Sequence, residues 1–452
     1  TLFRRLIWAL DDSAITVRAA AVRAIDNVVS ADHRILGVEQ IRSAIERRMT
    51  DSGTMVRSSI VDLLGKHMHK AEFANQYYKS ILERISDVGV SVRKRVINIL
   101  HSYLETLPNM SIRIEILRTL AFRISDDDTG VQELVVRIFR GLWLSQLPAS
   151  NHVCQLTDAE TTDFLSERAE HFVNVLWDVF CSVSRTGLAK LPLLPTFPIV
   201  AILRRTLSSS EDDAATLWKG DRKGTKDSID IIRANDMCNA ILNGLLLQEE
   251  YDGGREDALE VPFLIEDTQF DRRSYTLSFP RAVRYALGLH VFCVADRKLL
   301  VGDVNPTALV TALHPYLKRC ENNPANAIQL QCCLSVIDAV VEEVGCLSFS
   351  SACELEKDLR CLLLRSTYHG VLYYAARCIC STSKIDSGTG ALPGALQICY
   401  RFVKMLNEVC IERELSNGEH AHVARALFVL GHLARFGAET FENYGDREVS
   451  PP

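Results

Sequence analysis

Apolar residues recur at helical spacing in three successive stretches near the start of the chain. In the third stretch they are Val92, Val96, Ile99 and Leu100, at positions i, i+4, i+7 and i+8. This spacing gathers apolar side chains on one side of an α-helix. The other two stretches carry equivalent sets, which are Val56, Ile60, Leu63 and Leu64, and Val17, Ala21, Ala24 and Ile25. The pattern therefore predicts three amphipathic helices of the same design.

A short polar motif precedes each of these helices. It consists of an Asp, four further residues and Val-Arg, and its three copies end at Arg18, Arg57 and Arg93. A fourth copy ends at Gln132, where the Arg is replaced. The three arginines are 39 and then 36 residues apart, and Gln132 follows Arg93 by 39 residues. A nearly fixed period in this range is typical of stacked helical-repeat proteins.

The Asp of each copy follows a first helical stretch, such as residues 78–85. We expect its carboxylate to accept backbone N–H bonds in the turn and so to begin the second helix. Two helices cannot bury their apolar faces alone, so neighbouring repeats should stack around a shared core. The Arg can then reach the Asp of an adjacent repeat through a charge-assisted pair, which would fix the register of the stack. The predicted ladder consists of Asp12, Arg18, Asp51, Arg57, Asp87 and Arg93.

The rest of the chain divides by composition and helical pattern. We predict regular repeats over 1–148, an irregular helical segment with polar and acidic loops over 149–273, a second helical-repeat block over 274–447 and a tail over 448–452. Within the irregular segment, the acidic residues 249–273 indicate a surface loop. The second block should contain helices over 281–300, 306–320, 325–344, 351–367, 371–382, 392–413 and 419–436.

Almost no stretch alternates between apolar and polar residues with the period of two that strands require, so the predicted class is all-α. The Asp and Val-Arg motif resembles the HEAT repeat. The expected architecture is therefore a HEAT-repeat helical solenoid with an irregular, loop-containing middle section. The chain begins with Thr1 inside a helical pattern, and we expect it to be a piece of a longer protein, cut within a repeat.

Composition adds few constraints. The chain is 47% hydrophobic and 24% charged, as ordinary globular proteins are. Its longest apolar run, residues 285–295, contains a His and is too short to span a bilayer, so no membrane association is expected. Most of the fourteen Cys, such as Cys238, Cys332 and Cys361, lie in apolar helical stretches and read as small buried hydrophobes.

The sequence holds no recognisable reactive constellation. It contains no Gly-x-Ser-x-Gly elbow, no His-Glu-x-x-His motif and no Rossmann glycine fingerprint. The Cys and His residues lack the spacing of zinc ligands, and the acidic pairs fall at turns between helices, where they favour helix starts. We therefore expect no enzyme activity, no metal and no cofactor.

The basic residues are the candidate chemistry. The net charge is −6 overall but +4 over residues 1–148, which favours a nucleic-acid or acidic partner for this block. On the third repeat, Lys94 and His101 share one outward stripe and Arg95 lies beside it, because successive residues turn by about 100° around a helix. Arg23 and Lys66 occupy similar positions in the first two repeats. These residues form either one basic track or a solvated face with local ion pairs.

Several stretches resemble one family in order along the chain. Residues 75–104, NQYYKSILERISDVGVSVRKRVINILHSYL, are similar to a segment of the Nipped-B-type cohesin loader large subunit. The preceding MTDSGTMVRSSIVDLLGKHM resembles the previous HEAT repeat of that family. Later matches are ALHPYL at 312–317, LEKDLRCLLLRSTYHGVLYYAARCI, and RALFVLGHLARFG at 425–437. The resemblance covers most of the chain, most strongly at 50–104 and most weakly at 149–273.

This resemblance implies a nuclear, chromatin-associated HEAT adaptor that loads cohesin onto DNA. The family engages the cohesin ATPase heads and kleisin, binds double-stranded DNA and stimulates the ATPase of its partner. Its small helical-repeat adaptor binds an N-terminal region that this chain lacks. The residues expected at the DNA- or cohesin-facing surface are Arg23, Arg57, Lys66, Arg93, Lys94, Arg95 and His101. The alternative is a generic HEAT scaffold that binds protein partners only, such as another chromosome-complex subunit, a transport receptor or a phosphatase scaffold.

Overall fold

A computed structural model describes the chain over residues 2–144, 158–185, 197–217, 229–251, 259–265, 273–279, 281–300, 306–318, 324–344, 349–382, 393–409 and 417–438. The chain splits into two compact units, Thr1–Leu142 and Trp143–Pro452. The finer division into four segments stays a prediction, and the tail at 448–452 lies outside the described residues.

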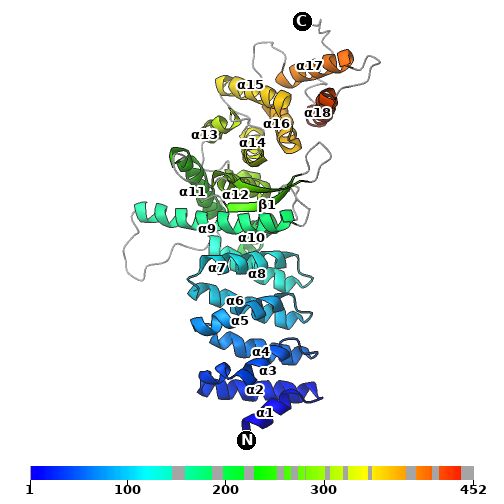
Figure 1. The fold of residues 1–452 in the computed structure, drawn as a ribbon. Coiled ribbons are helices and arrows are strands. Elements are labelled where there is room, and N and C mark those ends of the chain that lie inside the picture. Colours follow the sequence, from blue (N-terminus) through cyan, green and yellow to red (C-terminus); the bar gives the residue numbers. More distant parts are fainter. Residues whose placement is uncertain are drawn as a thin grey trace. The chain divides into compact units, whose positions relative to one another are not determined.

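The first unit is a stack of helix pairs (Figure 1). Its helices are α1 (Leu2–Leu10), α2 (Ile15–Ala31), α3 (Glu39–Arg48), α4 (Thr54–His67), α5 (Ala71–Glu83), α6 (Val90–Thr106), α7 (Met110–Ala121) and α8 (Thr129–Leu144), with 3₁₀ turns η1 (His33–Gly37), η2 (Arg84–Ser86) and η3 (Phe122–Ser125). The second helices of successive pairs lie side by side, because α2 packs against α4 and α4 against α6. This arrangement confirms the predicted stacked repeats.

The predicted apolar stripes form the core between these helices. In the second repeat all four predicted residues are buried, and in the third only Ile99 is partly exposed. Val17 of the first repeat departs from the prediction, since 40% of it is exposed. Its equivalents Val56 and Val92 are fully buried.

The second unit is also helical. Its elements are α9 (Asp158–Arg185), α10 (Pro198–Leu217), α11 (Ile229–Tyr251), β1 (Leu259–Ile265), β2 (Arg273–Phe279), α12 (Arg281–Ala295), η4 (Arg297–Leu300), α13 (Pro306–Lys318), α14 (Pro324–Val344), α15 (Phe349–Arg365), α16 (His369–Thr382), α17 (Gly394–Val409) and α18 (Asn417–Phe436). The even-numbered helices α12, α14, α16 and α18 pack in succession, and α13, α15 and α17 form a second row. The helices predicted from the sequence here are thus confirmed, apart from small differences at their ends.

One antiparallel hairpin interrupts the helices of this unit. Strands β1 and β2 pair in the register that places Leu259 opposite Phe279 and Phe263 opposite Tyr275. The prediction of a loop over 249–273 is therefore wrong in three places, because α11 continues to Tyr251, β1 spans Leu259–Ile265 and β2 begins at Arg273. The alternation of Leu259, Val261, Phe263 and Ile265 was the signal, which the acidic composition of the segment masked. The all-α class is confirmed, with this hairpin as an insertion.

Two general expectations also bear on function. Among the described helices, none combines the length and the apolar composition that a bilayer-spanning segment requires. Seven of the cysteines in the described part of the chain are buried, including Cys238 and Cys332. Cys361 is exposed, contrary to prediction, because it falls on the outward side of α15.

Candidate functional site

Each repeat turn is organised by its Asp in the same way. The Oδ1 atom of Asp51 accepts a 2.8 Å hydrogen bond from the backbone N–H of Gly53, and Asp87 accepts one of the same length from Gly89. These glycines are the N-terminal capping residues of α4 and α6. The carboxylate therefore shapes the turn from which the second helix starts, as the sequence predicted.

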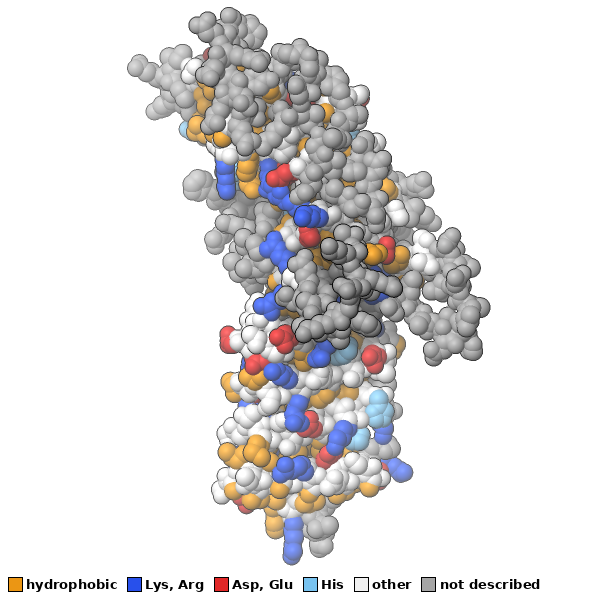
Figure 2. Space-filling model, turned by 180° about the vertical axis from the view of Figure 1, so that it is seen from behind, with side chains coloured by type: hydrophobic (Ala, Val, Ile, Leu, Met, Phe, Trp, Pro, Cys, Tyr) orange, Lys and Arg blue, Asp and Glu red, His pale blue; other side chains and the backbone are white. Residues whose placement is uncertain are grey.

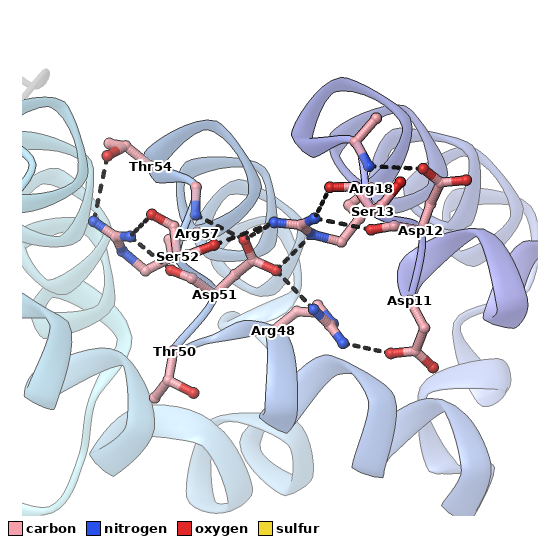
Figure 3. Close-up of polar contacts among 12 residues, drawn as sticks. Asp11, Asp12, Ser13, Arg18, Arg48, Thr50, Asp51, Ser52, Thr54 and Arg57 are labelled. Atoms are coloured by element: carbon pink, nitrogen blue, oxygen red, sulfur yellow. Dashed lines mark hydrogen bonds and ion pairs between the residues drawn. The ribbon is translucent and has the colours of Figure 1, made fainter.

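The ladder arginines join successive turns, and Figure 3 shows the first of these contacts, between Arg18 and Asp51. Arg18 donates through Nε and Nη2 to the two carboxylate oxygens of Asp51, at 2.9 and 2.8 Å. Arg57 binds Asp87 in the same two-pronged way, with both distances 2.7 Å. Arg93 donates one bond of 2.7 Å, from Nη2 to Asp126. The predicted pairing of each Arg with the Asp of the next repeat is confirmed.

Each of these arginines also holds its own turn. The Nη1 atom of Arg57 donates to the carbonyl oxygen of Asp51 at 2.7 Å, and Arg93 Nη1 donates to that of Asp87 at 2.8 Å. In the fourth copy, Gln132 Nε2 donates to the carbonyl oxygen of Asp126. The replacement of Arg by Gln thus keeps the contact within the turn and removes the positive charge that would bind a further Asp.

A second set of arginines supports the ladder and was missed in the sequence. Arg48, Arg84 and Arg123 each stand three residues before a ladder Asp. Arg48 Nη1 donates to Asp51 Oδ2 at 2.8 Å, whereas the equivalent nitrogens of Arg84 and Arg123 lie 3.8 Å from Asp87 and Asp126. The signal in the sequence was a repeated four-residue pattern. It begins with Arg, continues with any residue and then Ser or Thr, and ends with the ladder Asp.

These contacts set the electrostatics of the turns. Burial raises the pKa of Asp51, but hydrogen bonds from Arg18, Arg48 and Gly53 outweigh that effect and lower the pKa to about 2. The pKa of Asp87 is also below its ordinary value, because hydrogen bonds from Arg57 and Gly89 exceed the effect of burial. Both carboxylates are therefore ionised at neutral pH and bound to cations of the stack.

The ladder excludes two of the predicted surface residues. Arg57 is 5% exposed and Arg93 is 8% exposed, and both guanidinium groups face the turns. Direct contact with DNA would require each to leave a buried carboxylate. We therefore correct their assignment to the binding surface and keep them as register residues.

The remaining cations of the predicted track lie on the outer side of the second helices. Lys66 Nζ on α4 is 2.5 Å from Asp26 of α2, and Lys94 Nζ on α6 is 2.8 Å from Asp128, the residue that precedes α8. Arg95 of α6 forms an ion pair with Asp62 of α4. These side chains stay between 39% and 56% exposed. They form a second, outer line of ion pairs between neighbouring repeats.

Two further residues complete the predicted track. Arg23 is exposed on α2 and makes no ion pair with any described residue, while His101 on α6 is partly buried. Figure 2 shows one face of the molecule, on which Lys and Arg side chains are interspersed with Asp, Glu and His over the lower, N-terminal unit. On this face the exposed cations are thus mixed with acids rather than gathered in a uniformly basic patch.

A shallow hollow lies along the same helices. It has a volume of about 250 Å³ and is lined by residues of α4 and α6 and the turn after α4, namely Gly65, Met68, His69, Asn98, Ile99, Ser102, Tyr103 and Thr106. Its polar residues His69, Asn98, Ser102 and Thr106 are exposed to solvent.

Buried titratable groups in the second unit hold helices together. His290 of α12 lies 2.8 Å from the Ser335 hydroxyl of α14, and Arg377 of α16 lies 2.8 Å from Asp338 of α14. Burial lowers the pKa of His290 to about 4 and raises that of Asp338 to about 6. In the described part of the chain, no group of three or more His, Cys, Asp or Glu is arranged to hold a metal ion.

Comparison with known proteins assigns the class. Residues 23–64 match the family model for the HEAT repeat associated with sister chromatid cohesion. The structure superposes on the C-terminal fragment of the Chaetomium thermophilum cohesin loader SCC2 with a TM-score of 0.68 and 16% identity, over 99% of this chain and 29% of that one. The fold is thus that of HEAT-repeat proteins.

Sequence relatives narrow the assignment. Nipped-B-like protein A of Danio rerio is 36% identical over 149 residues, which are 33% of this chain and 6% of that protein. Nipped-B protein of Drosophila melanogaster is 25% identical over 443 residues, which are 96% of this chain and 18% of that protein. The chain is thus similar in sequence to Nipped-B proteins over nearly its whole length, and similar in fold to the SCC2 fragment. It spans less than a fifth of the length of these relatives.

Proposed function

We propose that this chain takes part in loading cohesin onto DNA, as a nuclear HEAT-repeat adaptor that binds double-stranded DNA and cohesin. Homology to the Nipped-B and SCC2 loaders over nearly the whole chain is the observation that carries this proposal. The partners would be the ATPase heads and the kleisin of cohesin, and the chain would stimulate the partner's ATPase rather than hydrolyse ATP itself.

The proposed DNA-contacting surface is the outer side of the second helices. It consists of Arg23 on α2, Lys66 on α4, and Lys94 and Arg95 on α6. Each of these helices lies beside the next in the stack, so the cations follow one another along it. This spacing suits a partner that carries a regular series of negative charges, as the phosphate backbone of DNA does.

The ion pairs of this surface are compatible with binding. Pairs between exposed charges contribute about 0–1 kcal/mol each, so exchange of a carboxylate for a DNA phosphate costs little. Because the contacts would be made to phosphates, binding should not depend on base sequence. Each neutralised phosphate releases a counterion, so affinity should fall steeply as the salt concentration rises.

Reversal of two charges tests the proposal. The variant Lys94→Glu/Arg95→Glu should bind duplex DNA at least ten-fold more weakly at low salt, measured by fluorescence anisotropy. A matched control, Arg34→Glu/Lys79→Glu, reverses two exposed charges that lie away from the second helices, on η1 and α5. Circular dichroism should show the same helix content in both variants. Equal DNA affinity of wild type and Lys94→Glu/Arg95→Glu would rule out this surface.

The competing function is a scaffold for protein partners only. The complete pairing of Lys66, Lys94 and Arg95 with acids is the observation that favours it. A scaffold would bind cohesin subunits with the same affinity in both charge-reversed variants and would show no salt-dependent DNA binding. Stimulation of the cohesin ATPase, measured with and without DNA for the same variants, separates the two functions.

A further inference from the structure

The first turn of the chain contains an acid that later turns lack. Asp11 stands immediately before the ladder residue Asp12. Arg48 of the second repeat reaches it through Nη2, while its Nη1 donates to Asp51 (Figure 3). Arg47 lies 3.5 Å from the same Asp11 oxygen. The pair of Asp11 and Arg48 therefore ties the first two turns together beside the main ladder.

The next turn has the matching arginine without the acid. The residue before Asp51 is Thr50, and the equivalent of Arg48 is Arg84. Arg84 Nη1 donates to the carbonyl oxygen of Met49, the residue before Thr50, at 3.4 Å. The guanidinium thus already reaches the turn that carries Thr50. Its nearest carboxylate among the described residues, that of Asp87, is 3.8 Å away.

Space for a negatively charged group exists at this turn. A hollow of about 270 Å³ is lined by Thr50, Asp51, Arg57, Glu83, Arg84, Ser86, Asp87 and Val88. This volume is several times the roughly 30 Å³ that one water molecule occupies. Thr50 is exposed at its edge, and its Oγ1 donates to the carbonyl oxygen of Arg47 at 3.1 Å.

The charges around Thr50 favour modification by a kinase. Arg47 and Arg48 stand three and two residues before it, and kinases select substrates partly by such charge patterns. Of the acids in the hollow, Asp51 and Asp87 are bound by ladder arginines. Glu83 is exposed to solvent, which screens its repulsion.

We propose that Thr50 is a phosphorylation site and that its phosphate binds Arg84. A serine/threonine kinase that selects basic residues would transfer the γ-phosphoryl group of ATP to Thr50 Oγ1. The new O–P bond forms as the bond to the β-phosphate breaks, ADP leaves, and the hydroxyl proton passes to the base of the kinase. The phosphate adds a charge of about −1.5 to −2 and three acceptor oxygens, which Arg84 binds as Arg48 binds Asp11.

Ser86 is the natural comparison within the chain. It occupies the same position before Asp87, and Arg123 is its matching arginine. A glutamate, Glu83, replaces the basic residue three positions before it. Ser86 therefore lacks one of the two features that mark Thr50, and it serves as an internal control.

The site is tested by treating the 452-residue chain with a kinase specific for the pattern Arg-Arg-x-Ser/Thr and magnesium ATP. Mass spectrometry should locate phosphate on Thr50, with at least five-fold less on Ser86, and Thr50→Val should lose the Thr50 signal. Arg47→Ala should slow the reaction at least five-fold. Absence of phosphate from Thr50 in the folded wild-type chain would overturn the proposal.

The role of Arg84 is tested on the phosphorylated chain by ³¹P NMR. A bound guanidinium stabilises the dianion, so the second pKa of the phosphate should be at least half a unit lower in wild type than in Arg84→Gln. Arg84→Lys should recover part of this shift, and Lys79→Gln should leave the wild-type value unchanged. The same phosphate pKa in wild type and Arg84→Gln would show that Arg84 does not bind the phosphate.

Discussion

The guanidinium of Arg57 binds both carboxylate oxygens of Asp87, with nitrogen to oxygen distances of 2.7 Å, and neither side chain is more than 6% exposed. The same Arg57 holds the backbone of its own turn through Nη1. One side chain therefore connects the turns of two repeats whose helices pack side by side. The register of the stack depends on this contact as well as on the apolar core.

Replacement of a ladder arginine should lower the free energy of unfolding, and the loss should be larger for Arg57 than for Arg93. Breaking a buried ion pair by removal of one partner costs about 3–5 kcal/mol, and we expect a loss in this range for Arg57→Ala. Arg93 makes one bond to its Asp where Arg57 makes two, so Arg93→Ala should cost less, about 1–3 kcal/mol. Urea unfolding followed by circular dichroism measures both variants. A smaller loss for Arg57→Ala than for Arg93→Ala would contradict the ladder geometry.

The ladder should also make stability depend on acid pH. The pKa of Asp51 is about 2 in the folded chain against an ordinary value of 3.8, so its carboxylate stabilises the folded state. That stability is fully present above about pH 5 and is lost as the pH falls toward 2. The contribution at neutral pH is about 2 kcal/mol.

Asp51→Asn removes the group that titrates and provides the comparison. We expect the difference in unfolding free energy between wild type and Asp51→Asn to shrink steadily between pH 5 and pH 2. A difference that stays constant over this range would show that Asp51 does not carry the acid sensitivity of the first unit.

Replacement of a turn glycine by a larger residue should destabilise the chain unless a side chain of the preceding turn is made smaller. A Cβ at Gly89 would lie 2.5 Å from Thr54 Cγ2 of the preceding repeat. Gly89→Ala should therefore destabilise the chain by about 1–3 kcal/mol, as overpacking does. Thr54→Ser removes that methyl group and keeps the hydroxyl near Arg57. The double variant should recover at least half of the loss in thermal melting, and no recovery would show that the two turns are not in contact.

Neutralisation of one track residue should reduce the salt dependence of DNA binding by a known amount. If Lys66 contacts one phosphate, Lys66→Gln should lower the slope of log affinity against log salt concentration by about 1. Lys79→Gln, on a first helix, should leave the slope unchanged. Fluorescence anisotropy with two unrelated duplex sequences measures the slopes. Equal slopes for wild type and Lys66→Gln would exclude a phosphate contact at this residue.

Local patterns in the sequence were enough to predict much of the first unit. The apolar spacing of Val56 and Ile60 and the recurrence of Asp and Arg indicated stacked helix pairs with a charged register. Both features repeat at a fixed period, so each copy supports the others. The hairpin at Leu259 was missed because a short alternating stretch inside an acidic segment gives a weak signal. Arg48, Arg84 and Arg123 were missed although their position relative to the Asp also repeats.

The repeat architecture, the ladder pairs and the resemblance to cohesin loaders could all be predicted from the amino-acid sequence, because each depends on spacing along the chain. Which cations are available for binding could be learned only from the packing of the helices. Arg57 and Arg93 are buried in the ladder, whereas Lys66, Lys94 and Arg95 are held by Asp26, Asp128 and Asp62 of neighbouring repeats. These acids lie far from their partners in sequence and come close only when the second helices pack. Arg84 likewise contacts the turn of Thr50 only because neighbouring repeats pack together, since the two are far apart in sequence.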